Sequence, residues 1–196
     1  MNLKRTITVI MSFALLFTTV GCNRKQTNPT PEVPQAEEHA SLDKNYIEKY
    51  SRFYGDNISD LKRYQMYGDV NATNEYYATN EYPGNEAYLN EVKTGYKDTK
   101  EKMQSFVNYL KNDLNTDDES LKQMSSELAA EGEKIISNID VRLKELEALP
   151  KESMNKSQEE FIRLVNESKT VTGDARTKFN NILRDMNTKL GVGTNK

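Results

Sequence analysis

Apolar and small residues recur every three or four positions along three long stretches of the chain. In the first stretch they are Leu89, Val92, Tyr96, Thr99, Met103, Phe106 and Leu110. In the second they are Leu121, Met124, Leu128, Gly132, Ile135, Ile139, Leu143 and Leu146. In the third they are Phe161, Val165, Ser168, Thr172, Ala175, Phe179, Ile182, Met186 and Leu190. This spacing is typical of helices that pack at a shallow angle. We therefore expect three helices of about 30 residues, each roughly 45 Å long.

The ends of these stretches carry helix-boundary signals. Asn85 can cap the first helix, and Thr116 with Glu119 forms a capping box before the second. Pro150 ends the second helix, because proline cannot continue a helix from within. The segment Ser-Gln-Glu-Glu at 157–160 forms a further capping box. Since the connections are short, neighbouring helices must fold back on each other. The sequence predicts an all-α fold, an antiparallel three-helix bundle of long helices.

Small residues gather near the middle of each long stretch. They are Gly95, Thr99, Ala129, Ala130, Gly132, Thr170, Thr172, Gly173 and Ala175. Antiparallel helices of equal length bring their midpoints to one level, so we expect a waist of small side chains. Two interpretations stay open. Either the helices approach closely or kink there, or a small polar cavity for a ligand remains.

The stretch before the first long helix predicts one or two short helices packed on the bundle. Its apolar positions are Leu42, Tyr46, Tyr50 and Phe53, followed after an interruption at 55–57 by Ile58, Leu61, Tyr64 and Tyr67. All 11 tyrosines of the chain lie between Tyr46 and Tyr109. Tyrosine offers a stiff, amphipathic contact area suited to a partner or a sugar. Short helices also use tyrosine where the ring is buried and the hydroxyl group is hydrated.

A repeated pentad raises a separate question. Ala-Thr-Asn-Glu-Tyr occurs at 72–76 and again at 78–82. Six residues turn a helix by about 240°, so two helical copies would face different directions, and asparagine and glutamate are poor strand formers. We therefore expect a duplication accommodated in a surface loop, where added length costs little. The alternative is a recognition loop, whose candidate partner-binding residues are Tyr76, Tyr77, Tyr82 and Tyr88.

The first 22 residues carry the strongest signal in the chain. Lys4 and Arg5 precede the uncharged, largely apolar run 7–20, which has the length of a signal-peptide core. Gly21 and Cys22 follow, and Cys22 is the only cysteine. This stretch resembles the lipobox of bacterial lipoproteins, although Thr19 departs from the usual leucine. The resemblance implies cleavage between Gly21 and Cys22 and attachment of diacylglycerol to Cys22.

These signals divide the chain into four parts. We expect a signal peptide at 1–21, a lipidated, disordered tether at 22–40, the helical domain at 41–190 and a frayed tail at 191–196. Residues 23–40 contain three prolines and few apolar residues, so this tether could reach roughly 50 Å from the membrane. We therefore expect the domain on the extracytoplasmic face of the cell membrane.

The remaining composition excludes several classes of chemistry. The whole chain has a net charge of −3, and removal of 1–21 takes away Lys4 and Arg5 alone, which leaves −5. This charge argues against nucleic acid as a partner. The single histidine, His39, lies in the expected tether, so no His-rich or Cys-rich metal site and no Ser-His-acid triad can form in the domain. We expect no cofactor, no metal and no enzyme, although hydrolysis by carboxylates alone stays open.

Together these features predict a lipid-anchored protein that acts by protein–protein interaction at the bacterial cell envelope. Its partner would be another envelope protein or an incoming one, such as a phage or conjugation component. The alternative is a cell-wall or small-ligand binding module that uses the Tyr-rich region 46–109.

Overall fold

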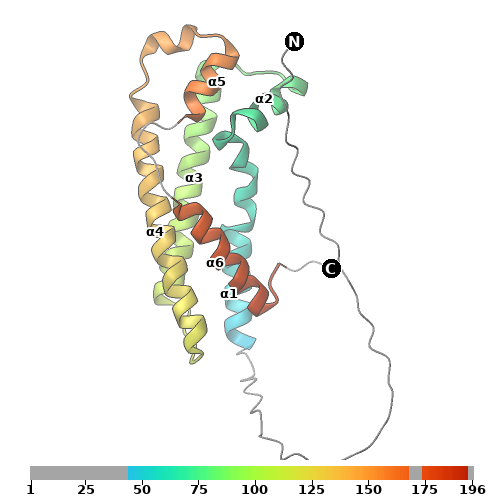
Figure 1. Cartoon of the computed structure of the whole chain (residues 1–196), viewed down its shortest axis with the longest axis vertical. Coiled ribbons are helices and arrows are strands. Elements are labelled where there is room, and N and C mark those ends of the chain that lie inside the picture. The colour runs from blue at the N-terminus through green and yellow to red at the C-terminus, as the bar shows by residue number, and fades with distance from the viewer. Residues whose placement is uncertain (1–43, 168–173, 194–196) are drawn as a thin grey trace, which may run out of the picture. The chain divides into compact units, whose positions relative to one another are not determined.

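A computed structural model describes residues 44–167 and 174–193, and every regular element among them is helical (Figure 1). The elements are α1 (Lys44–Asn57), η1 (Ser59–Gly68, a 3₁₀ helix), α2 (Val70–Thr79), α3 (Asn85–Asn112), α4 (Glu119–Glu147), η2 (Lys151–Asn155, also 3₁₀), α5 (Gln158–Asn166) and α6 (Ala175–Leu190). The expectation of an all-α fold is confirmed for these residues.

Helices α3 and α4 form an antiparallel hairpin, as their short connection predicts. Ion pairs link the two helices at two levels, Lys111 Nζ to Glu133 Oε1 at 2.7 Å and Lys100 Nζ to Asp140 Oδ1 at 2.6 Å. As the residue number falls along α3 it rises along α4, which fixes the antiparallel sense. This hairpin is the frame on which the other elements pack.

The third long stretch does not form one continuous helix. α5 ends at Asn166, because Glu167 has an extended backbone with φ −82° and ψ 117°. α6 begins only at Ala175. The sequence between them, 168–173, is rich in β-branched residues and ends in glycine, and these residue types have low helix propensity. The periodic pattern of apolar residues hid this weakness.

The N-terminal elements occupy a fourth position beside α3. Tyr50 contacts Phe106 near the C-terminal end of α3, whereas Tyr67 contacts Tyr88 near its start. The segment formed by α1 and η1 therefore runs antiparallel to α3. Lys189 of α6 pairs with Asp118 at 3.2 Å, so α6 runs antiparallel to α4. The described elements thus form four antiparallel segments, which we call legs: α1 with η1, then α3, then α4, then α5 with α6. The first and the last of these legs each consist of two separate helices.

Two clusters of buried side chains hold these legs together. The α1–α6 cluster joins α1, the C-terminal half of α3, the start of α4 and α6, and it includes Tyr50, Phe106, Leu121, Leu128, Phe179 and Met186. The α2–α5 cluster joins α2, the start of α3, the end of α4 and α5, and it includes Tyr77, Tyr88, Val92, Leu146, Phe161 and Ile162. Val192 is buried in the first cluster, so packing continues past the end of α6.

The repeated pentad is not simply a surface loop. Residues 70–79 form α2, in which Thr73 is fully buried and donates a hydrogen bond to the Met66 carbonyl at 2.6 Å. The first copy of the pentad is therefore helical, whereas the second leaves the helix after Thr79. The expectation of a spacer loop is wrong for the first copy, because tertiary contacts of Thr73 and Tyr77 stabilise a helix that the pattern alone did not reveal.

The helix caps agree with the sequence at one boundary and differ at two. Ser157 caps α5 as expected, and its hydroxyl accepts from the Glu160 backbone N–H. The cap of α4 is Asp118, which accepts from the Leu121 N–H at 3.0 Å, so the proposed box of Thr116 with Glu119 does not form. Asn85 is the first residue of α3 rather than its cap. Its Nδ2 donates to the Met154 and Lys156 carbonyls and ties α3 to η2.

Candidate functional site

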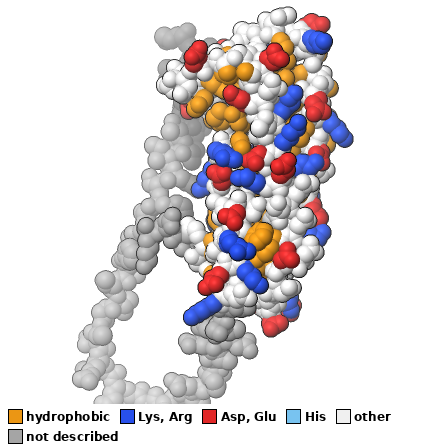
Figure 2. Space-filling model, turned by 180° about the vertical axis from the view of Figure 1, so that it is seen from behind, with side chains coloured by type: hydrophobic (Ala, Val, Ile, Leu, Met, Phe, Trp, Pro, Cys, Tyr) orange, Lys and Arg blue, Asp and Glu red, His pale blue; other side chains and the backbone are white. Residues whose placement is uncertain are grey.

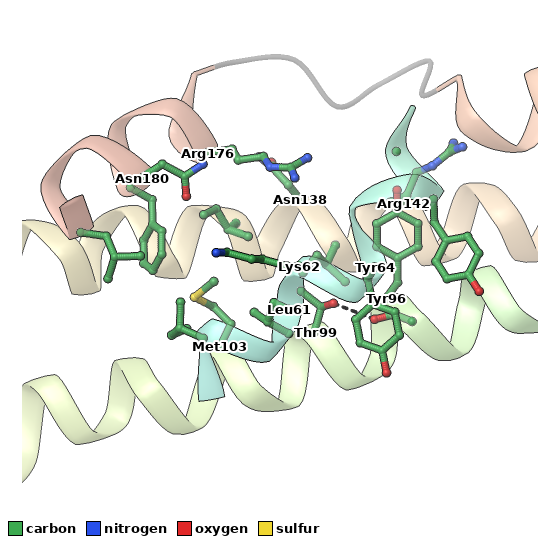
Figure 3. A pocket seen from close by; sticks show the side chains of 18 of the residues that line it. Leu61, Lys62, Tyr64, Tyr96, Thr99, Met103, Asn138, Arg142, Arg176 and Asn180 are labelled. Atoms are coloured by element: carbon green, nitrogen blue, oxygen red, sulfur yellow. Dashed lines mark hydrogen bonds between the residues drawn. The ribbon is translucent and has the colours of Figure 1, made fainter. Parts of the chain in front are cut away.

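A cavity of about 460 Å³ lies between the two core clusters. Its lining comes mainly from η1, α3, α4 and α6 (Figure 3). Tyr54 of α1 and Asn166 of α5 also line it. It therefore lies at the level of the junction between α1 and η1, near the end of α5 and the start of α6. Members of both clusters, Met103 and Tyr67 among them, face it.

Both features expected at the waist of small residues occur: helices approach each other closely at Gly132, and a cavity lies beside Gly95. At Gly132 a methyl group would lie 2.5 Å from Cγ2 of Val107, so α3 and α4 approach closely there. At Gly95 a methyl group would lie 3.0 Å from Tyr64 Cδ1 and 3.2 Å from Tyr67 Cδ2. Two tyrosine rings of η1 thus rest on the backbone of α3 beside the cavity. Residues 170, 172 and 173, also assigned to the waist, lie outside the described residues.

Much of the cavity lining is apolar or aromatic. These residues are Tyr54, Ile58, Leu61, Tyr64, Tyr67, Tyr96, Met103, Ile135, Ile139, Phe179 and Leu183. Burial raises the pKa of Tyr67 to about 12, and the nearby Glu91 carboxylate acts in the same direction. Burial also raises the pKa of Tyr64. Both phenols therefore stay protonated at neutral pH and add no negative charge to the cavity.

The polar part of the lining combines three cationic side chains with five neutral ones. It consists of Ser59, Lys62, Thr99, Asn138, Arg142, Asn166, Arg176 and Asn180. Thr99 Oγ1 is already engaged, since it donates to the Gly95 carbonyl at 2.7 Å, the bond drawn in Figure 3. Lys62 and Arg176 are exposed residues, so they stand where the cavity meets solvent.

Arg142 lines the cavity and has a structural role. It is buried, with 5% of its surface exposed. Its guanidinium group pairs with Glu145 at 2.7 Å and donates to the Val165 carbonyl in the last turn of α5. A cation near a helix C-terminus is favourable because it offsets the partial negative charge there. Arg142 therefore fastens α5 to α4 beside the cavity.

Asn166, next to Val165 in α5, has a side-chain oxygen without a hydrogen-bond partner among the described residues. Its Nδ2 donates to Tyr88 Oη and to the Ile162 carbonyl, both at 2.8 Å. Its Oδ1 is buried and has no hydrogen-bond partner among the described residues. Buried polar groups normally have a partner, so this oxygen is available to a hydroxyl or amine donor.

The four tyrosines proposed for partner binding fall into different environments. Tyr88 is fully buried and Tyr77 is 9% exposed, whereas Tyr82 is half-buried. These three rings pack against one another with centroid distances of 5.1 to 5.8 Å. Only Tyr76 presents a large surface, with 45% of the residue exposed. The structure brings the group together as a core cluster, and a partner could reach mainly Tyr76.

The residues assigned to processing, Gly21 and Cys22, lie outside the described residues. The sequence missed the cavity residues Lys62, Asn138 and Arg176, because each looks like an ordinary surface residue of a helix. The small residues of the waist were the one signal that pointed to this level.

No described helix is long and apolar enough to cross a membrane. Among the described residues, no group of His, Cys, Asp and Glu could hold a metal ion.

Comparison of the chain with protein-family models, with curated proteins and with solved structures found no match.

Proposed function

We propose that the protein binds a small amphipathic ligand in the cavity between its two core clusters, as a lipid-anchored module on the extracytoplasmic face of the bacterial cell membrane. The observation that carries this proposal is the cavity itself. Its volume of about 460 Å³ falls within the range of roughly 300–1,000 Å³ that is usual for small-molecule sites. Such sites combine apolar walls with a few polar groups, and this cavity has both.

The bundle provides a rigid scaffold for such a site. In this proposal, the three-helix frame expected from the sequence corresponds to α3, α4 and the broken leg α5–α6, with η1 as the fourth wall. Cavity residues on α3 and α4 come from long helices that pack directly on each other. Helix positions hold side chains more precisely than loops do. The proposal includes no cofactor, no metal and no catalysis.

The cellular setting rests on the N-terminal sequence. The lipobox-like segment around Cys22 and the tether at 22–40 motivate a domain held off the membrane by a flexible linker. A ligand-binding domain in this position could take up a molecule from the cell envelope.

Interaction with another envelope protein or an incoming protein is the second candidate. Exposed Tyr76 favours it, because exposed aromatic residues commonly anchor protein interfaces. Among the described residues, only Tyr76 and Val141 are large hydrophobic residues with strong exposure, and they lie on different helices. Figure 2 shows positive and negative side chains interspersed over one face. The described surface therefore favours this candidate less than the cavity favours ligand binding.

The experiment uses a neutral fluorescent amphiphile, N-phenyl-1-naphthylamine, and the full mature chain with Cys22→Ser so that no lipid competes. We expect saturable binding with a fluorescence increase. Thr99→Phe places a ring in the cavity and should abolish binding. Thr94→Phe is the matched control, because Thr94 is exposed on the same helix and donates to the Asn90 carbonyl at 2.8 Å, much as Thr99 bonds to Gly95.

Two outcomes decide the proposal. Loss of binding in Thr99→Phe with retention in Thr94→Phe supports it, provided that both variants keep the helical circular dichroism of the parent. Absence of binding by the parent protein, or equal binding by both variants, contradicts it, because the dye would then not enter the cavity.

A further inference from the structure

All the charged residues that line the cavity are cationic. Lys62, Arg142 and Arg176 contribute three cationic side chains, and none of the lining residues is an aspartate or glutamate. The chain as a whole has the opposite bias, with 30 acidic and 27 basic residues. A lining of a single sign raises the local concentration of counter-ions and gives a cavity a preference for ligand charge.

Two carboxylates near this level, those of Asp98 and Asp140, are already paired with other cations. Asp98 precedes Thr99 on α3 and lies 2.9 Å from Arg63 Nη2. Burial opposes ionisation of Asp98, yet hydrogen bonds from Tyr64 and Arg63 and the charge of Lys102 hold its pKa below the usual value. Asp140 follows Ile139 on α4 and pairs with Lys100 at 2.6 Å. Both acids are therefore paired with cations outside the lining, and neither neutralises the lining cations.

Two of the three lining cations have no ionic partner among the described residues. Arg142 pairs with Glu145. For Lys62 and Arg176, no ion pair with any described residue occurs within 4.0 Å. The two side chains come from separate legs, Lys62 from η1 and Arg176 from the first turn of α6. Figure 3 shows both in the space between α6 and the α3–α4 hairpin.

The geometry around Arg176 adds to the positive potential. Its Nη1 reaches to 3.8 Å from the position of a methyl group at Gly68, so the side chain extends from α6 to the end of η1. Arg176, Phe179 and Asn180 bring the N-terminal part of α6 to the cavity. The N-terminus of a helix carries a partial positive charge. Asp174 does not cap α6 with its side chain and instead pairs with Lys178 at 3.2 Å.

Resting on the proposed ligand-binding function, we infer that the ligand is a small anionic amphiphile. Its apolar body would lie against Met103, Phe179 and the aromatic wall, and its single anionic group would lie between Lys62 and Arg176. A guanidinium group and an ammonium group together offer up to eight N–H donors to a carboxylate, sulfonate or phosphate oxygen.

A matched pair of dyes tests this inference. N-phenyl-1-naphthylamine is neutral, and 8-anilinonaphthalene-1-sulfonate has the same anilinonaphthalene body with one sulfonate. At low ionic strength we expect the parent protein to bind the sulfonate dye about tenfold more tightly than the neutral dye. The double variant Lys62→Gln, Arg176→Gln should lose this preference and bind the neutral dye as the parent does. Lys144→Gln with Arg184→Gln removes two exposed cations outside the cavity and should keep the preference.

The outcomes separate this inference from the proposed function. The neutral dye can bind to the parent protein and not to Thr99→Phe, while the sulfonate dye binds no more tightly than the neutral dye. In that case the cavity binds ligands and the preference for anions is wrong. If neither dye binds, ligand binding itself is refuted. Vesicles of phosphatidylglycerol provide a further arm. Vesicle binding that requires Lys62 and Arg176 but survives Thr99→Phe would overturn the inference, because the two cations would then serve a membrane surface.

Discussion

Replacement of Gly132 by alanine tests how closely α3 and α4 approach. A methyl group at this position would lie 2.5 Å from Cγ2 of Val107 and 3.5 Å from both Met103 Sδ and Phe179 Cε2. The last two distances are ordinary contacts, so Val107 must move. Val107 is only 3% exposed, and a β-branched side chain in a helix has one strongly preferred rotamer. The strain cannot be relieved by a simple side-chain rotation.

The expected magnitude follows from two opposing terms. Alanine in a helix interior is favoured over glycine by about 1 kcal/mol. Carbon atoms prefer a separation of roughly 3.5–4 Å, so the helices or Val107 must shift by about 1 Å. Overpacking of this kind costs up to about 3 kcal/mol. The free energy of unfolding should therefore fall by about 2 kcal/mol, which lowers the melting temperature by about 4–8 °C for a chain of this size.

The chain offers a control for helix propensity. Gly55 lies in α1 and is exposed, and a methyl group added there would meet no neighbouring atom within 4 Å. Gly55→Ala should therefore raise the stability by up to about 1 kcal/mol. Thermal unfolding followed by circular dichroism measures both variants. A rise in melting temperature for Gly132→Ala would refute the close approach, and so would a failure of Val107→Ala to relieve its effect in the double variant.

Two further predictions concern the lipid anchor and the tyrosine cluster. Cys22→Ala should release the protein from membranes or leave its precursor unprocessed in a detergent-partition assay, and a mature-sized product that still enters the detergent phase would contradict lipidation. Tyr77→Ala should lower the free energy of unfolding by about 3 kcal/mol because it empties a buried site, whereas Tyr76→Ala should change it by less than about 1 kcal/mol. Denaturant titration checks both, and equal effects would show that Tyr77 is not part of the core.

Local sequence pattern was enough to predict the fold class and the central hairpin. Residues of α3 and α4 repeat at helical spacing over about eight turns, and the short connection at 113–118 leaves only an antiparallel arrangement. A long amphipathic stripe has one way to bury its apolar face, so local pattern and tertiary packing agree. The boundaries at Glu147 and Ser157 follow from proline and from a capping serine, which act within one turn of the chain.

The course of the two broken legs depends on tertiary contacts instead. The stretch at 70–79 has weak helical character, yet it is helical because Thr73 and Tyr77 are buried against η1 and α3. The third stretch has a continuous apolar pattern, yet α5 ends at Asn166. Apolar periodicity reports which face a helix would bury, and it says little about whether the helix continues through residues of low propensity.

The candidate site depends on long-range geometry. Lys62 and Arg176 are separated by more than 100 residues, and nothing in the local sequence of either distinguishes it from a solvated surface cation. The small residues Gly95 and Gly132 marked the level of the waist, but they could not say whether space would remain. That depended on η1, whose tyrosines rest on Gly95, and on where the start of α6 packs, since Arg176 and Phe179 line the cavity. A cavity is a property of what several elements leave unfilled, so only the packed structure defines it.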